Sequence, residues 1–243
     1  MALLVTCAVR AHPEIPTSNG NVESRLAEYG RGLASLMFYS RIGPIVVCEG
    51  SGFPEQRFRA AVASARTPPF EYVSLSTTGE SARRGKGLAE LDLIAGGLDQ
   101  SEQLADSDRI LKVTGRYEIL NGRAIVATLL RGSALPDVQA NLYNRLTYAD
   151  SRFFTFSQEF FRRSLYPKRG DIDDRHSVWL EHVLARAILS HVASYGSWAP
   201  LPYPVRAAGA SGTTGAAFHA SLARYSLERG KHWLKLRSLG RAG

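Results

Sequence analysis

The chain has 243 residues, of which 44% are hydrophobic and 21% are charged. This is the ordinary composition of a globular domain, and it excludes a disordered tail, a collagen-like chain and a small disulfide-bonded protein. Thirty basic residues against 22 acidic ones give a net charge of +8, which favours polyanionic partners such as nucleic acid, phosphorylated small molecules or anionic lipid.

The first half of the chain alternates short apolar runs with amphipathic stretches. Apolar runs rich in β-formers predict strands, and hydrophobic residues at three- and four-residue spacing predict helices. In chain order the predicted elements are a strand at 3–9, a loop at 12–21, a helix at 24–39, a strand at 45–48, a helix at 55–65, a strand at 70–75, a helix at 87–96 and a strand at 110–113. This alternation predicts an α/β fold with a mostly parallel sheet and helices on both faces.

The second half is less regular. Its predicted elements are strands at 125–130 and 152–156, a helix at 178–191, a loop at 197–204, a glycine-rich loop at 209–215 and a basic helical stretch at 216–237. No repeat, low-complexity segment or linker separates the two halves. We therefore expect a single domain, with residues 1–215 as its main part and residues 216–243 as a basic C-terminal helix that packs on it or contacts a membrane.

Candidate ligand-binding residues follow the predicted strands, because ligands of open parallel sheets bind beyond the carboxyl ends of the strands. These candidates are Arg10, Glu49, residues 76–80, Thr114, Gly115 and Arg116. Lys112 lies inside the predicted strand at 110–113 and needs a partner there, since burying an unpaired charge is costly. An anionic ligand is one possible partner, and an ordinary strand exit with a surface arginine is the alternative interpretation.

Two glycine-containing turns suit phosphate groups. Glycine lets backbone N–H groups approach a ligand, and the start of a helix favours anions. Arg83-Arg84-Gly85-Lys86-Gly87 precedes a predicted helix, and the glycine-rich loop contains Ser211, Gly212 and Thr213. Neither turn matches a standard nucleotide-binding motif. The alternatives are a solvated basic turn and a flexible connector.

A carboxylate and an imidazole lie side by side in Trp179-Leu180-Glu181-His182, at the start of a predicted helix. Glu181 or His182 could act as a general base. The alternative is a polar first turn, where the helix dipole favours a glutamate. Further upstream, the aspartates at 171, 173 and 174 could bind a divalent cation through oxygen ligands or form a solvated loop.

Several of these segments occur together in a familiar order. They read R-L-A-E-Y-G at 25–30, I-V-V-C-E-G-S-G at 45–52, R-G-K-G-L-A-E-L at 84–91 and I-L-K-V-T-G-R-Y at 110–117, with weaker matches at W-L-E-H (179–182) and in the glycine-rich loop. Together they resemble bacterial glycosyltransferase-like proteins of capsule and lipopolysaccharide biosynthesis. The resemblance spans about residues 1–215, and K-V-T-G-R-Y is its most specific part. The chain departs from it at Gly50, where an asparagine is expected.

The resemblance implies a GT-A-like fold and transfer of a sugar from a nucleotide donor to a glycan or lipid-linked acceptor. Positive side chains would stabilise the departing diphosphate, and a base would take the acceptor proton. The implied leaving-group residues are Lys86, Lys112, Arg116 and the loop around Ser211, Gly212 and Thr213. Glu181 or His182 would act as the base toward the acceptor hydroxyl. Glu49 and Glu90 would bind hydroxyl groups of the donor sugar.

The sequence also predicts catalysis without a divalent metal. Many GT-A enzymes carry an Asp-x-Asp pair after a central strand, whereas this chain carries Thr114-Gly115-Arg116 there. Lys112 and Arg116 place fixed positive charge where the cation would lie, and a guanidinium can pair two phosphate oxygens at once. We expect no other cofactor. The aspartates at 171, 173 and 174 are the competing interpretation, as metal ligands.

The remaining sequence features concern location and partners. No apolar stretch is long enough to cross a bilayer, the run at 2–9 is too short for a signal peptide, and Cys7 and Cys48 suit buried thiols in a reducing compartment. We expect a cytoplasmic protein whose C-terminal helix touches anionic membrane through an apolar stripe with basic flanks. The alternatives are a nucleic-acid-binding protein, although no nucleic-acid-binding motif is present, and another nucleotide-using enzyme.

Overall fold

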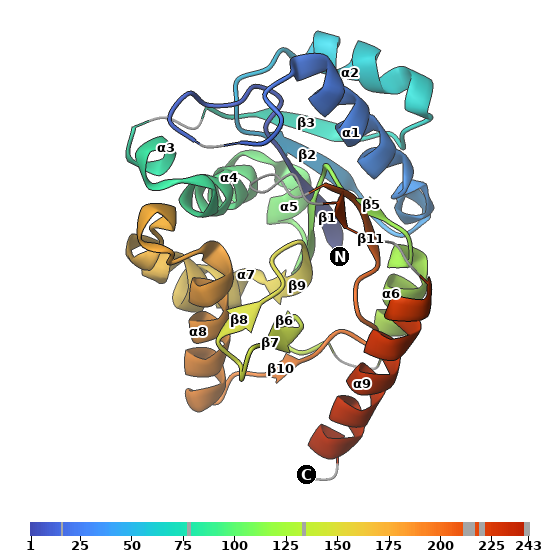
Figure 1. The fold of residues 1–243 in the computed structure, drawn as a ribbon, viewed down its shortest axis with the longest axis vertical. Coiled ribbons are helices and arrows are strands. Elements are labelled where there is room, and N and C mark those ends of the chain that lie inside the picture. The colour runs from blue at the N-terminus through green and yellow to red at the C-terminus, as the bar shows by residue number, and fades with distance from the viewer. Residues whose placement is uncertain (16, 77–78, 133–134, 211–216, 219–221, 241–243) are drawn as a thin grey trace.

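A computed structural model of the chain describes residues 1–15, 17–76, 79–132, 135–210, 217–218 and 222–240. Its centre is a seven-stranded sheet with the strand order β10-β6-β9-β4-β1-β2-β3 (Figure 1). The strands are β1 (Ala2–Cys7), β2 (Ile45–Glu49), β3 (Glu71–Ser74), β4 (Arg109–Thr114), β6 (Val138–Gln139), β9 (Phe153–Ser157) and β10 (Trp198–Ala199). β9 runs antiparallel to β4 and β6, and the other pairs are parallel. The predicted α/β class with a mostly parallel sheet is confirmed.

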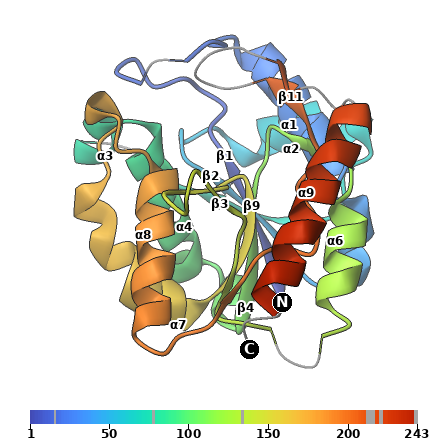
Figure 2. The same ribbon diagram turned by 60° about the horizontal axis from the view of Figure 1, so that its bottom comes forward.

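Helices cover both faces of this sheet (Figure 2). One face carries α4 (Lys86–Gln100), α5 (Glu102–Ala105), α7 (Gln158–Phe160) and α8 (Leu180–Ala193), and the other carries α1 (Val22–Ala34), α2 (Glu55–Val62) and α6 (Gly122–Leu129). Because side chains alternate along a strand, neighbouring residues of β1 enter different cores: Leu4 packs under α4, and Leu3 and Val5 pack under α1. The sheet is thereby buried on both faces, as a parallel sheet requires.

Short helices complete these connections. They are η1 (Met37–Arg41), η2 (Ala63–Ala65), α3 (Glu80–Arg84), η3 (Phe161–Leu165), η4 (Tyr166–Asp171) and η5 (Asp174–His176). The helix predicted at 24–39 is divided into α1 and η1, and the one at 178–191 is α8. The last two short helices carry the chain past α3 and α4 into α8.

The apolar stretch at 125–130 is a helix and not the predicted strand. Ile125, Val126 and Leu129 of α6 are its buried apolar side chains, and this spacing is that of one helical face. A short apolar run fits a buried strand as well as a buried helix, so periodicity alone misassigned it. The apolar runs that form β1 and β2 were correctly predicted as strands, and all residues of these strands are buried.

Two small sheets and a long helix complete the fold. The strands are β5 (Glu118–Ile119), β11 (Ala207–Ala210) and β12 (Ala217–Phe218) in one sheet, and β7 (Leu142–Tyr143) and β8 (Tyr148–Ala149) in the other. The C-terminal helix α9 (Leu222–Gly240) lies beside α6 in both views (Figures 1 and 2). Among the described residues, none of the helices has the length and apolar character needed to cross a membrane.

Candidate active site

A buried lysine organises the carboxyl ends of β1 and β4. The side chain of Lys112 is 0% exposed, and its ammonium donates to Glu90 Oε1 at 2.6 Å, to Thr114 Oγ1 at 2.8 Å and to the Ser151 carbonyl at 2.6 Å. A lysine has three N–H donors, so all of them are used within the protein. The partner that the sequence required is therefore a carboxylate of α4. Lys112 positions Glu90, and its ammonium is not available to a ligand phosphate.

Glu90 is the meeting point of this network. Its Oε1 also accepts from Thr6 Oγ1 at 2.8 Å and lies 3.2 Å from Thr114 Oγ1, and its side chain is 22% exposed. Thr6 and Thr114 are register partners at the ends of β1 and β4. The contacts described for this carboxylate fall on Oε1, which leaves Oε2 able to accept hydrogen bonds from a ligand hydroxyl.

Glu181 joins the same network through Ser151. Ser151 Oγ donates to Glu181 Oε1 at 2.7 Å, while the Ser151 carbonyl accepts from Lys112. Burial raises the pKa of Glu181, and the negative charge of Glu90 adds to this, whereas the Ser151 hydroxyl and Lys112 oppose it. A carboxylate with a raised pKa is a better proton acceptor, which is the property required of a general base.

His182 has a different environment from its neighbour. Its Nδ1 accepts the backbone N–H of Trp179 at 3.3 Å, and its ring stacks on the indole with the centroids 5.0 Å apart. The ring of Tyr148 meets His182 edge-on at 5.6 Å. Of the two predicted bases, the structure links Glu181 to the Lys112 network and gives His182 a capping and stacking position.

Three cations lie near the N-terminus of α4. Burial lowers the pKa of Lys86 to about 8, and the positive charges of Arg116 and Arg25 lower it further, against the opposing effect of Asp174. Arg116 pairs with Glu28 at 2.7 Å, and its side chain is 9% exposed. Such mutual repulsion between cations is relieved by an anion, so this group is the electrostatic feature that best suits a phosphate.

Arg25 adds positive charge to this group, but its guanidinium donates hydrogen bonds to backbone carbonyl groups. Its Nε donates to the Ala8 carbonyl at 2.9 Å and its guanidinium also contacts the Asn19 carbonyl at 3.0 Å. Tyr29 Oη accepts the Ala8 N–H at 2.8 Å. These contacts fasten the chain that leaves β1 to α1.

The glycine turn before α4 is filled by an internal carboxylate. Asp174 Oδ2 accepts the Gly87 backbone N–H at 3.1 Å. Gly85 has φ +115°, and a Cβ at Gly85 would lie 2.5 Å from the Asp174 side chain. The glycines therefore admit Asp174 to the start of α4, where the sequence suggested phosphate. Burial raises the pKa of Asp174, against the backbone N–H groups of Gly87 and Lys86.

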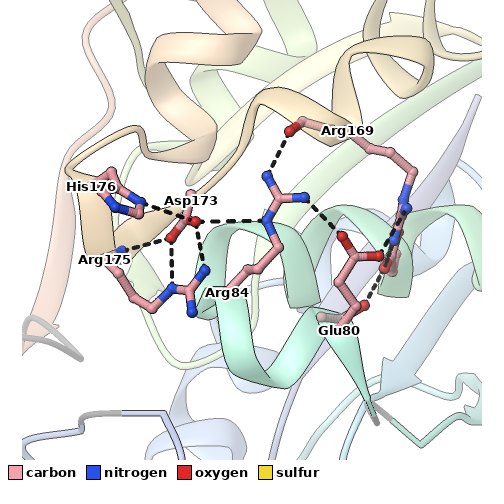
Figure 3. Close-up of polar contacts among 9 residues, drawn as sticks. Glu80, Arg84, Arg169, Asp173, Arg175 and His176 are labelled. Carbon is pink, nitrogen blue, oxygen red and sulfur yellow. Dashed lines mark hydrogen bonds and ion pairs between the residues drawn. The ribbon is translucent and has the colours of Figure 1, made fainter.

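Asp173 of the same segment forms ion pairs (Figure 3). Asp173 Oδ2 pairs with Arg175 at 2.7 Å, contacts His176 at 3.1 Å and lies 3.9 Å from Arg84. Asp171 is exposed. In the described part of the chain, no group of three or more His, Cys, Asp or Glu side chains is arranged to hold a metal ion.

The remaining candidates near the strand ends support the backbone. Glu49 is 0% exposed, and its carboxylate accepts backbone N–H groups of Val9 and Phe53, both at 2.8 Å. Gly115 packs on β1, where a Cβ would lie 2.7 Å from Val5 Cγ1. Arg10 is exposed, with its guanidinium 5.3 Å from the ring centroid of Phe53. Glu49 therefore has its oxygens occupied by the loops after β1 and β2.

The glycine-rich loop cannot be placed in this site. Ser211, Gly212 and Thr213 lie outside the described residues. Their predicted role toward phosphate stays a prediction.

Thr6 and Ser151 are site residues that sequence reasoning missed. Thr6 is one polar residue in an apolar strand, and it sits beside Thr114 only because β1 and β4 are neighbours in the sheet. The signal that could have found it is a hydroxyl at the carboxyl end of each of two central strands. Ser151 lies before β9, the antiparallel strand that alternation of strands and helices did not predict.

No protein-family model and no curated protein matches the chain. Similar solved structures include a proposed nucleotide-diphospho-sugar transferase from Desulfovibrio desulfuricans G20, with 11% identity and a TM-score of 0.47 over 82% of this chain and 78% of that one. An active-site mutant of LgtC has 13% identity and a TM-score of 0.46 over 76% and 69% of the two chains.

A nucleoside-diphosphate-sugar pyrophosphorylase from Vibrio cholerae RC9 has 10% identity and a TM-score of 0.46 over 83% of this chain and 91% of that one. Identities and TM-scores this low transfer no residue roles. The chemistry of the site is therefore argued from the contacts of this chain.

Proposed function

We propose that the chain is a glycosyltransferase that moves a sugar from a nucleoside-diphosphate donor to a glycan or lipid-linked acceptor of the cell surface. The observation that carries the proposal is the Glu90–Lys112–Ser151–Glu181 network at the carboxyl ends of β1 and β4, with the cations Lys86 and Arg116 at the same end. A carboxylate with a raised pKa and a separate group of cations, both near the carboxyl ends of these strands, support displacement of a phosphorylated leaving group.

In the proposed reaction, the acceptor hydroxyl oxygen forms a bond to the anomeric carbon of the donor. The bond from that carbon to the diphosphate oxygen breaks, and its electron pair leaves with the nucleoside diphosphate. Glu181 takes the acceptor proton. Lys86 and Arg116 stabilise the negative charge that develops on the diphosphate.

Glu90 has a separate role, toward the donor sugar. Lys112, Thr6 and Thr114 hold its Oε1, so the orientation of the carboxylate is set before a ligand binds. Its Oε2 accepts donor hydroxyl groups. This preorganisation lowers the entropy lost on binding.

Fixed cations are proposed to replace a divalent metal at the diphosphate. Asp173 is engaged by Arg175 and His176, and Asp174 by the start of α4, so the aspartate segment already has partners within the protein. We propose that catalysis proceeds through Lys86 and Arg116 without magnesium or manganese.

The C-terminal helix is proposed to place the enzyme at the cytoplasmic face of an anionic membrane, near lipid-linked acceptors. Leu227 and Leu234 of α9 are 67% and 62% exposed, and Arg229 and Lys231 are exposed between them. Tyr225 ties the start of α9 to Asn121 at 3.0 Å. The apolar stripe predicted from the sequence consists of Phe218, Leu222, Tyr225, Trp233, Leu234 and Leu236, so the exposed Leu227 adds to it. The side chains of Phe218, Leu222 and Leu236 are not described by the structure. Co-sedimentation with anionic vesicles, weakened in Leu234→Glu, is the expected result.

A screen of nucleotide sugars for thermal stabilisation tests the function. A ligand that binds the folded chain raises its melting temperature by mass action. We expect one sugar nucleotide to stabilise the chain equally in excess EDTA and in added magnesium, and turnover to release a nucleoside diphosphate. Release of pyrophosphate would instead identify a nucleotidyltransferase. Retention on heparin without stabilisation by any nucleotide sugar would favour nucleic-acid binding.

Turnover abolished by EDTA and restored by metal would contradict the metal-independent mechanism. Loss of turnover in Arg116→Ala, with EDTA without effect, is the result expected for fixed cations.

A further inference from the structure

Three aromatic side chains gather at the start of α8, next to Glu181. The indole of Trp179 and the imidazole of His182 stack with their centroids 5.0 Å apart and their planes 18° apart. Tyr148, from β8, meets the other side of this group, with its ring edge-on to His182 at 5.6 Å. The cluster therefore joins α8 to the strand that precedes Ser151.

The indole is held in place although much of it is open to solvent. Trp179 is 43% exposed, while stacking on His182 sets its orientation. The backbone N–H of Trp179 in turn donates to His182 Nδ1 at 3.3 Å. An exposed aromatic ring that is already oriented loses little conformational freedom when a ligand stacks on it. Large apolar groups left exposed in this way mark binding surfaces when they lie beside a polar site.

The carboxylates of Glu181 and Asp150 lie near this cluster, and the nearby cation Arg152 is paired with Asp150 at 2.7 Å. Burial raises the pKa of Tyr148, and the negative charges of Glu181 and Asp150 raise it further. The cations suited to a diphosphate belong to α4 and to the chain after β4. A phosphorylated group is disfavoured beside Glu181, whereas a neutral ring with hydroxyl groups can donate hydrogen bonds to it. A sugar ring has both an apolar C–H face and such hydroxyls.

We propose that Trp179, His182 and Tyr148 form the acceptor subsite, and that it binds a sugar ring whose C–H face stacks on the indole while one hydroxyl reaches Glu181. This assignment rests on the proposed glycosyltransferase function and adds to it the chemical class of the acceptor group bound next to the base. Tyr148 and His182 are positioning residues here, since they hold the indole.

The test uses the full chain and two separate readouts. The first is binding of the labelled protein to an array of immobilised bacterial-type oligosaccharides, with UDP, GDP, CDP or ADP present. The second is the rise in melting temperature that these nucleotides cause. Trp179→Leu keeps an apolar side chain without the flat ring, and Trp179→Phe keeps a ring. Tyr195→Asn is the matched control, because Tyr195 is fully exposed beyond the other end of α8 at φ +66°, which asparagine tolerates.

We expect Trp179→Leu to weaken glycan binding by about tenfold or more, the scale of losing a central aromatic anchor. Trp179→Phe should retain most of the glycan binding, and Tyr195→Asn should retain all of it. The rise in melting temperature caused by the nucleotides should be unchanged in all three variants. Equal glycan binding by Trp179→Leu, or no glycan bound by the wild-type chain, would overturn the proposal. A nucleotide shift lost in Trp179→Leu would also overturn it, by assigning the indole to the nucleobase. Failure of the glycosyltransferase proposal is separate, because it appears as no stabilisation by any sugar nucleotide.

Discussion

Two ion-pair networks of this chain use the same kinds of side chain in different surroundings. The inner network is Lys112 with Glu90, whose side chains are 0% and 22% exposed. The outer network joins Glu80, Arg84, Arg169, Asp173, Arg175 and His176 (Figure 3). Its central carboxylate, Asp173, is 15% exposed, but its partners Arg175 and His176 are 58% and 77% exposed, whereas the cation of the inner network is 0% exposed. The comparison teaches that burial, more than the number of pairs, decides which network controls stability and chemistry.

The physical reason is the cost of removing charge from water. A buried ion left without its partner is strongly destabilising, whereas an exposed pair is screened by solvent and contributes little. In the outer network a hydrogen bond from Arg175 holds the pKa of Asp173 well below its usual range. In the inner region, burial instead raises the pKa of Glu181. The outer network fastens the segment that leads into α8, and the inner one holds the proposed reacting groups.

The largest expected effect is that of removing the inner cation. Lys112→Met removes the cation from the Glu90 carboxylate, which keeps Thr6 and Thr114 as donors, and leaves the Ser151 carbonyl without the Lys112 donor. The free energy of unfolding should therefore fall by about 3 kcal/mol. Urea denaturation measures this. The double variant Lys112→Met, Glu90→Met is the control, and it should recover most of the loss. A loss below about 1 kcal/mol in the single variant would mean that the buried Lys112–Glu90 pair contributes no more to stability than an exposed ion pair.

The next effect concerns the base. Glu181→Gln keeps the size and the hydrogen bond from Ser151 but cannot take a proton, so turnover should fall by about a hundredfold with little change in melting temperature. The sugar nucleotide found in the stabilisation screen serves as substrate. His182→Ala is the matched comparison. Full turnover in Glu181→Gln with loss in His182→Ala would reverse the two roles, and full turnover in both would make this helix start purely structural.

A smaller effect should follow the titration of Lys86. Its pKa of about 8 means that the ammonium is mostly charged near pH 7 and mostly neutral near pH 9. Binding of UDP should therefore weaken by roughly tenfold between these two pH values, measured by calorimetry. Lys86→Arg keeps its charge and should show no such slope. An equal slope in both proteins would remove Lys86 from the donor site.

The same pKa shift has a consequence for folding. Between pH 8 and the ordinary lysine range, the unfolded chain binds a proton that the folded chain has lost. The free energy of unfolding should therefore rise with pH in this window. Lys86→Met should remove this rise in the free energy of unfolding. If the rise persists in the variant, another titrating group causes it.

The smallest effect is expected in the outer network. Asp173→Asn removes the negative charge that Arg175 and His176 share, and the free energy of unfolding should change much less than in Lys112→Met. The melting temperature of this variant, read beside that of Lys112→Met, gives the direct contrast between the two networks. A loss as large as that of Lys112→Met would show that exposure does not separate them.

The sequence by itself determined β1, β2, β3, β4 and β9, most of the helices and the mostly parallel sheet, because apolar periodicity is a local property of the chain. It did not identify the two-residue strands β6 and β10 of the central sheet, and β10 falls in a predicted loop. It also determined that Lys112 needs a partner, since a charge inside an apolar strand cannot stay unpaired. It failed at α6, where a short apolar run suits either kind of element. It also predicted the strand at 152–156, which is β9, but not that this strand runs antiparallel to β4 and β6.

Only the tertiary structure decided which groups meet. Glu90 reaches Lys112 across 22 positions of the chain, Glu181 reaches Ser151 across 30, and Asp174 reaches Gly87 across 87. From the sequence, Lys112 and the Gly85–Gly87 turn both suited phosphate, and the folded chain supplies carboxylates of its own to both. Such pairings depend on strand order and helix packing, which cannot be inferred from the chemistry of individual side chains. The site therefore exists because the carboxyl ends of β1 and β4 bring these distant segments together.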